Sequence, residues 1–335
     1  MEKEVTLAAL EEIITRAEAG EGCSREEALS LVELDLKALM EGADRIRCAH
    51  FGNRVELCSI INAKCGDCDM DCAFCSQSKR ASTRIETYPF IEAEELREQM
   101  KRILADGLRR CSVVTSGGRL RPEELERLLD AAREAGPAPL CASLGRLRRE
   151  ELEQLKAAGV RRFHHNLETS QAFYPRICST QRWEQRLETV RAAIEAGMDV
   201  CSGGLFGLGE SWEDRIDLAL VLRDLGVDSV PINFLYAHPG TPLADQPPLS
   251  ADEALRIVAI YRFLLPKMTL RICGGRAHVL GDRQRELFAA GANGIMTGDY
   301  LTVSGSQYEA DLAMLRKQGL EPVRYENAAT SAVTE

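Results

Sequence analysis

The sequence lacks a long apolar run, a basic leader and an excess of positive charge. No stretch of it approaches the ~18 consecutive apolar residues of a membrane-spanning helix. Residues 1–20 predict an acidic amphipathic helix, in place of the basic start and apolar core of a signal peptide. The net charge is −10, and the lysines and arginines are interspersed with acidic residues. These features argue against membrane and nucleic-acid partners and predict a cytoplasmic protein.

Cysteine, in contrast, is abundant, because the 335 residues include 12 of them. In a reducing cytoplasm such cysteines are more often metal ligands or buried thiols than disulfides. Five of them lie between residues 58 and 78, and this stretch carries the strongest chemical signal in the sequence.

The spacing of three cysteines in this stretch, C-x3-C-x2-C, predicts an iron–sulfur cluster. Cys68, Cys72 and Cys75 have this spacing, and Phe74 precedes the last of them. Three such thiolates can hold three irons of a 4Fe–4S cubane and leave the fourth iron open, as a catalytic metal requires. Cys65 adds a fourth thiol, so a zinc knuckle in a structural or sensor protein is the alternative.

Apolar runs and amphipathic segments alternate from residue 55 onward. The runs predict strands at 55–62, 110–116, 139–145, 162–168, 199–206, 229–236, 269–274 and 292–297. The charged segments predict helices at 92–107, 121–136, 148–158, 182–197, 211–226, 250–265, 282–290 and 307–318. Repeated βα units of this number predict a closed (βα)₈ TIM-type barrel, and an open doubly wound sheet is the alternative.

The same pattern divides the chain into three regions. Residues 1–50 predict an N-terminal helical extension, in which Ser24 and Glu27 have the spacing of a capping box. Residues 51–322 form the expected barrel, and residues 323–335 a polar tail; the chain from 321 onward predicts no regular structure. The cysteine triplet then lies in a long loop after the first strand, at the barrel end where active sites are found.

Four further cysteines fall on the predicted strands. They are Cys111, Cys141, Cys201 and Cys273, on the second, third, fifth and seventh strands. Inward positions of different strands face one axis in a closed barrel, so these thiols predict a second iron–sulfur site. The alternative is that each is a small buried packing residue. Cys58, on the first strand, is left undecided.

Several polar residues on the predicted strands are further candidates for the site. Asn166 and Glu168 share one face, where Glu168 could bind a ribose diol or pair with an arginine. Asn233 lies inside an apolar strand and must bond either neighbouring backbone or a polar substrate. Arg271 lies two residues before Cys273 and needs an anionic partner inside the barrel. Glycine runs at 115–119 and 202–211 favour close backbone approach to a bulky cofactor.

Together these residues carry a resemblance to radical S-adenosylmethionine (SAM) enzymes and, among them, to the biotin synthase family. The segments that resemble it are CSQS at 75–78, FHHNLETS at 163–170, DVCSGGLFGLGE at 199–210, SVPINFL at 229–235, GTPLAD at 240–245 and RICGGR at 271–276. The likeness runs from about residue 30 to 322, nearly the whole chain.

The resemblance implies the roles of the residues at one end of the barrel. It implies that Cys68, Cys72 and Cys75 hold a 4Fe–4S cluster whose open iron binds SAM. It implies that the residues contacting SAM are Phe74, Gly117, Gly118, Asn166, Glu168 and Arg186. Asn166 and Asn233 would also contact dethiobiotin, Asn233 at its ureido ring. The implied reaction cleaves SAM to a 5′-deoxyadenosyl radical, removes hydrogen from two carbons of dethiobiotin and inserts sulfur.

The resemblance also implies an auxiliary iron–sulfur cluster that supplies the sulfur. Cys111, Cys141 and Cys201 match its cysteines, and Arg271 matches its arginine ligand. Cys273 adds a thiolate, which resembles the family's anaerobe-type members with a four-iron 4Fe–5S cluster; otherwise a 2Fe–2S cluster is expected. Glu168 replaces the family's commoner aspartate.

The partners implied by the family are dethiobiotin, SAM, a one-electron donor such as flavodoxin or ferredoxin, and a second copy of the chain in a homodimer. Related radical SAM enzymes, a hydrogenase maturase or a methylornithine synthase, are the alternative activity.

Overall fold

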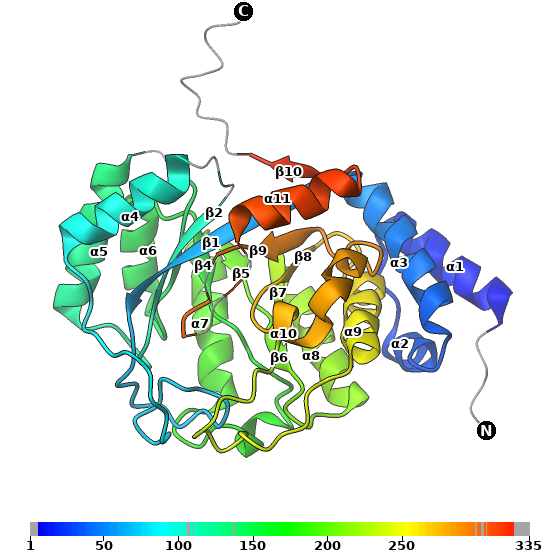
Figure 1. The fold of residues 1–335 in the computed structure, drawn as a ribbon, viewed down its shortest axis with the longest axis horizontal. Coiled ribbons are helices and arrows are strands. Elements are labelled where there is room, and N and C mark those ends of the chain that lie inside the picture. The colour runs from blue at the N-terminus through cyan, green and yellow to red at the C-terminus, as the bar shows by residue number, and fades with distance from the viewer. Residues whose placement is uncertain are drawn as a thin grey trace, which may run out of the picture.

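A closed parallel barrel forms the centre of the molecule (Figure 1). The structure is a computed structural model that describes residues 6–105, 108, 110–136, 138–298, 300–302, 305 and 307–324. The strands that form the barrel are β1 (Arg54–Lys64), β2 (Arg110–Thr115), β3 (Leu140–Ser143), β4 (Arg162–His164), β5 (Asp199–Cys201), β7 (Ser229–Phe234), β8 (Thr269–Ile272) and β9 (Gly294–Met296). They pair in this order, and β9 pairs back with β1, so the barrel is closed and the open sheet is excluded.

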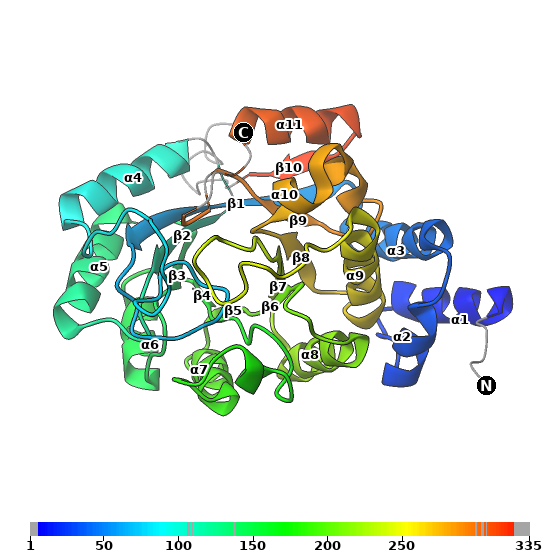
Figure 2. The same cartoon turned by 60° about the horizontal axis from the view of Figure 1, so that its bottom comes forward.

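Helices surround the barrel, as the view along it shows (Figure 2). They are α4 (Ala93–Ala105), α5 (Pro122–Ala135), α6 (Arg149–Ala157), α7 (Trp183–Glu195), α8 (Trp212–Leu225) and α9 (Ala251–Leu264), with α11 (Tyr308–Lys317) after the last barrel strand. Their apolar faces pack on the outer face of the sheet, and most of the core lies there. Within the described residues, no helix is long and apolar enough to cross a membrane.

Three elements differ from the expected pattern. The fifth strand is interrupted after β5 and continues as β6 (Gly204–Phe206). At the break, Gly203 lies so close to Pro231 that a Cβ atom would come within 2.1 Å of the proline's carbonyl oxygen. Instead of one helix at 282–290, α10 (Arg276–Leu280) is followed by a 3₁₀ helix, η2 (Gly281–Leu287).

The third difference lies at the C-terminus. Residues expected to be unstructured form β10 (Glu321–Val323), which pairs in parallel with the start of β1. Apart from this strand and Arg324, the predicted tail lies outside the described residues, as does Gly107 at the end of the predicted helix 92–107.

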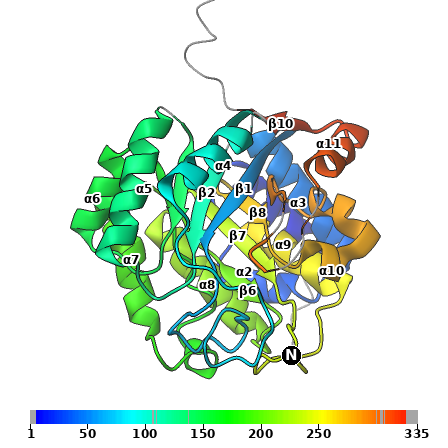
Figure 3. The same ribbon diagram turned by 60° about the vertical axis from the view of Figure 1, so that its left-hand side comes forward.

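The N-terminal region forms three helices, α1 (Leu7–Glu18), α2 (Arg25–Leu31) and α3 (Leu36–Phe51). Ser24 and Glu27 make the predicted capping box at the start of α2. These helices pack beside α8 and α9, on the side of the barrel away from α4, α5 and α6 (Figure 3). Gly42 of α3 lies in close contact with its neighbours, because a Cβ there would lie 2.8 Å from Phe263 and 2.9 Å from Ile14.

The close packing at Gly42 predicts that a larger side chain destabilises the fold. We expect Gly42→Leu to lower the free energy of unfolding by about 1–3 kcal/mol, because it overpacks the contact between α3 and α9. Urea unfolding of the cluster-free protein measures this. Glu41→Ala, at an exposed position of the same helix, is the control; an equal loss in both variants would contradict the packing argument.

Candidate active site

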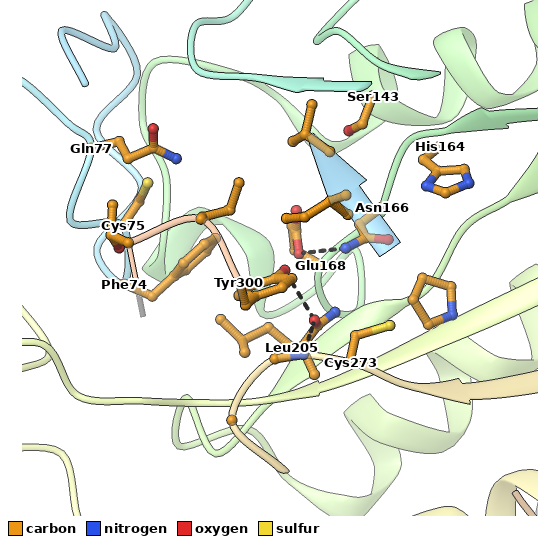
Figure 4. A pocket seen from close by; sticks show the side chains of 18 of the residues that line it. Phe74, Cys75, Gln77, Ser143, His164, Asn166, Glu168, Leu205, Cys273 and Tyr300 are labelled. Atoms are coloured by element: carbon orange, nitrogen blue, oxygen red, sulfur yellow. Dashed lines mark hydrogen bonds between the residues drawn. The ribbon is translucent and has the colours of Figure 1, made fainter. Parts of the chain in front are cut away.

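A cavity of about 570 Å³ lies at the end of the barrel where the strands meet their following loops. Figure 4 shows side chains that face it from several strands and from the cysteine loop. The predicted residues that line it are Cys68, Cys72, Phe74, Cys75, Gly117, Gly118, Asn166, Glu168, Arg186, Cys201, Asn233, Arg271 and Cys273. The fold therefore brings most of the predicted site into one space.

The cysteine loop is held in place by Asp71. Its carboxylate accepts hydrogen bonds from the backbone N–H groups of Ser179 and Thr180, at 2.9 and 3.0 Å, and from both of their hydroxyls. Arg80 adds an ion pair at 3.2 Å. Burial acts to raise the pKa of Asp71, but these hydrogen bonds outweigh it and hold the pKa well below its ordinary value.

The three thiols of the loop lie in mainly apolar surroundings, and each has a raised pKa. Burial raises the pKa of Cys68, and it raises that of Cys75 to about 11. A hydrogen bond with Cys178, together with burial, raises the pKa of Cys72. Cys178 is thus a further thiol beside the loop, whereas the backbone of Cys65 forms a bridge with Tyr88 at the base of the loop.

The three thiols of the loop lie near one another, because Cys68 acts on Cys75 and Cys75 acts on Cys72. Among the described residues, no three or more His, Cys, Asp or Glu side chains are close enough to hold a single metal ion. A cubane binds each thiolate through a different iron, so its ligands are spaced more widely than those of one ion.

The glycine turn at 117–118 makes room for the cysteine loop. The N–H of Gly118 donates to Asp69 at 3.1 Å, and a Cβ on Gly118 would lie 2.9 Å from the sulfur of Met70. Gly117 has a φ of +105°, which L-residues rarely adopt. Gly118 is therefore needed for contact with the cysteine loop and Gly117 for the shape of the turn, and both line the cavity.

Glu168 and Arg186 form a partly buried ion pair at one wall of the cavity. Arg186 donates to Glu168 at 2.8 Å, to the carbonyl oxygen of Asn166 at 2.7 Å and to Gln181 at 2.8 Å. Burial raises the pKa of Glu168, although Arg186 and Asn166 act against it. Glu168 has a φ of +70°, a strained conformation for this residue type. The arginine pairing considered from sequence is thus present, and the carboxylate still borders the cavity.

Asn233 is held by backbone groups and by a tyrosine that the sequence did not single out. Its Nδ2 donates to the carbonyl of Gly204 at 3.1 Å, and its Oδ1 accepts from the N–H of Gly274 at 3.0 Å. The hydroxyl of Tyr300 also donates to this oxygen at 3.1 Å (Figure 4). Tyr300 follows the last barrel strand, where no motif or periodicity marks it.

Arg271 lies on the barrel floor with its side chain almost fully buried. It donates to Glu56 at 2.6 Å and to Ser229 at 3.1 Å, and its guanidinium is 3.8 Å from the sulfur of Cys201. The anion that this arginine was expected to need is therefore supplied partly by the carboxylate of Glu56 on β1.

Cys111 does not face the barrel axis with the other strand cysteines, although it lies near Cys141 and Cys58 on the neighbouring strands. In the strand register Ser112, not Cys111, lies beside Cys141 of β3. Neighbouring side chains on a strand point to opposite faces, so Cys111 packs in the apolar core outside the barrel. The sequence correctly assigned Cys111 to the second strand, but the inward position on that strand is Ser112, one residue later.

The barrel floor carries more positive than negative charge. The ion pairs of Arg110, Arg162 and Arg271 involve two carboxylates, Glu56 and Asp199. Buried guanidinium nitrogens of all three arginines also lack hydrogen-bond partners. Buried charges need partners, so this floor fits an anionic, thiolate-ligated cluster.

Comparisons with known proteins find relatives along most of the chain. The family model of the Radical SAM superfamily matches residues 64–222, and that of the Biotin and Thiamin Synthesis associated domain matches residues 231–321. Biotin synthase of Desulfovibrio desulfuricans is 56% identical over 88% of this chain and 94% of its own length. Biotin synthase of Desulforudis audaxviator is 45% identical over 90% of this chain and 94% of its own length.

Solved structures agree on the fold. A methylornithine synthase superposes with a TM-score of 0.81 at 22% identity, covering 93% of this chain and 97% of that one. A hydrogenase maturase from Carboxydothermus hydrogenoformans superposes with a TM-score of 0.80 at 18% identity, covering 97% of this chain and 81% of that one.

The barrel and the C-x3-C-x2-C loop at its mouth thus define a radical SAM enzyme. Within that class, the identity over most of its length shows that the chain belongs to the biotin synthase family.

The hydrogen bonds of Asp71 predict a pH-dependent contribution to stability. We expect Asp71→Asn to lower the free energy of unfolding by about 1.5–3 kcal/mol at neutral pH, because it removes hydrogen bonds to a charged group. The folded pKa lies below the unfolded value near 3.8, so this stabilisation is fully present above 3.8 and is lost as the pH falls from there through the lower folded pKa.

Urea unfolding of both cluster-free proteins across the acid range measures this difference. The two stabilities should converge at low pH, and a difference that stays constant with pH would contradict the ionic role of Asp71.

Proposed function

We propose that this chain is a radical SAM sulfurtransferase that converts dethiobiotin to biotin. The observation that carries the proposal is the 56% identity to a biotin synthase along almost the whole chain. The cavity supports it, because one space joins the cysteine loop to the thiols of the barrel floor.

Cys68, Cys72 and Cys75 would hold the 4Fe–4S cluster, with one iron left for SAM. When bound there, the cluster and SAM supply a 5′-deoxyadenosyl radical that removes hydrogen from carbon. The chain's own part is to orient SAM and to exclude water. Glu168, fixed by Arg186, presents a carboxylate for the ribose hydroxyls, while Phe74 and the Gly117–Gly118 turn border the remaining cofactor space.

Asn233 and Asn166 would bind the substrate. The Oδ1 atom of Asn233 already accepts two hydrogen bonds, and its Nδ2 carries a second N–H beyond the one given to Gly204. Asn233 is therefore suited to donate to the carbonyl oxygen of a ureido ring. Asn166 accepts from the N–H of Gly203 at 3.3 Å, which orients its amide beside Glu168.

An auxiliary iron–sulfur cluster at the barrel floor would supply the sulfur. Cys141, Cys201 and Cys273 belong to its surroundings, and Arg271 contacts Cys201. Thiolates in this number favour a four-iron cluster, of the 4Fe–5S form, over a 2Fe–2S cluster. We also infer that the enzyme acts in the cytoplasm as a homodimer, with flavodoxin or ferredoxin as the electron donor.

The activity is tested with anaerobically reconstituted protein, dethiobiotin, SAM and a reductant. We expect biotin and 5′-deoxyadenosine, and we expect neither from the Cys68→Ala/Cys72→Ala/Cys75→Ala variant, because it lacks the SAM-binding cluster. Formation of 5′-deoxyadenosine without biotin by the loaded enzyme would favour a different radical SAM activity, such as that of a methylornithine synthase.

The size of the auxiliary cluster is tested by iron and sulfide analysis of the same triple variant. We expect about four irons per chain, because the floor offers Cys58 in addition to Cys141, Cys201 and Cys273, whereas a 2Fe–2S cluster with an arginine ligand uses three thiolates. A value of about two irons per chain would contradict the four-iron assignment.

A further inference from the structure

Cys58, which the sequence left undecided, lies on the inner face of the barrel. Its backbone aligns with Arg110 of β2 on one side and with Met296 of β9 on the other. The side chain is 2% exposed, and it lines the same cavity as Cys201 and Cys273. Cys58 is therefore a buried thiol that borders the reaction space.

Arg271 connects Cys58 to the other two thiols. Cys58, Cys201, Cys273 and the carboxylate of Glu56 all lie near its guanidinium. The guanidinium lies 3.8 Å from Cys201 and belongs to a strand whose next inward residue is Cys273. Three thiols from β1, β5 and the end of β8 thus surround one buried cation.

Some buried polar atoms that face the space among these thiols have no hydrogen-bond partner in the protein. Nε of Arg271 and Nε2 of His164 are buried there without hydrogen-bond partners, and both residues line the cavity. The thiol of Cys58 has one weak contact, 3.8 Å to the carbonyl oxygen of Ser59. Buried polar groups without partners are uncommon unless something binds to them, so a cysteine present only for packing does not account for this arrangement.

Cys111 differs from Cys58 in the direction of its side chain. It is also fully buried, but it packs in the apolar core between the sheet and the helices. A ligand of a cluster at the cavity floor must point toward the barrel axis, and Cys111 instead packs among the apolar side chains outside the barrel.

We propose that Cys58 is a ligand of the auxiliary iron–sulfur cluster, together with Cys201 and Cys273, and that Cys111 is not. The proposal rests on the proposed function in so far as that function requires an auxiliary cluster. Thiolates from opposite sides of the barrel then hold the cluster at the cavity floor, where the excess positive charge of Arg110, Arg162 and Arg271 offsets their negative charge.

The proposal is tested in the Cys68→Ala/Cys72→Ala/Cys75→Ala background, which retains only the auxiliary site. Adding Cys58→Ala should cause loss of most of the remaining iron and sulfide and of the Mössbauer signal, as adding Cys201→Ala should. Adding Cys111→Ala is the matched control, because it also removes a fully buried thiol, and it should leave all three measurements unchanged. Full retention of iron by the Cys58 variant, or loss confined to the Cys111 variant, would overturn the proposal.

Thiol labelling of the unmodified protein provides a readout that does not depend on the folding of a variant. Cys58 should resist alkylation in the loaded protein and react after a chelator has removed the iron, as read by peptide mass spectrometry. Cys111 should be equally slow in both states. Reaction of Cys58 at the same rate with and without iron would exclude it as a ligand.

These results are separable from the outcome of the biotin assay. Iron content and labelling report on the auxiliary site even if the enzyme makes another product. A protein that forms biotin but holds its auxiliary iron without Cys58 would overturn the ligand assignment alone.

Discussion

The ion pair between Arg271 of β8 and Glu56 of β1 is the contact on which the site depends. It joins two strands that flank β9, at the point where the barrel closes, and its Nη2–Oε2 distance is 2.6 Å. A charge buried this deeply requires a partner and a fixed geometry. Because Glu56 holds one side of the guanidinium, its other side is directed at Ser229 and Cys201. The cation is thereby fixed among the inward thiols.

From this floor the cavity extends to the cysteine loop, and its two ends are built differently. The floor is made of strand residues, whose positions are set by the hydrogen-bonded register of the barrel. The cysteine loop has little regular structure, and it is fixed by Asp71 and by the Gly117–Gly118 turn. The walls between them carry Asn166, Glu168 and Asn233, each oriented by several hydrogen bonds. Such preorganisation suits a reaction in which a radical must meet one carbon at a time.

Sequence reasoning was reliable where chemistry depends on local spacing. The C-x3-C-x2-C loop, the alternation of strands and helices and the capping box at Ser24 are contained within short stretches, and each is present in the structure. It was less reliable for the break between β5 and β6 and for η2, where the backbone conformation depends on distant residues. Gly203, for example, lies against Pro231. Tyr300 could not have been found, because its partner Asn233 is 67 residues away and no pattern links them.

The class of fold, the cysteine loop and the strands that carry the other thiols could all be predicted from the amino-acid sequence. It could not determine which of those thiols face inward, because a shift of one residue turns a side chain to the opposite face of a strand. Only the pairing of β2 with its neighbours shows that Ser112 faces the axis and Cys111 the outer core. The closure of β1 against β9 likewise places Cys58 beside Arg271. Tertiary structure therefore decided the membership of the inner thiol set, since register is a property of paired strands and not of any one strand.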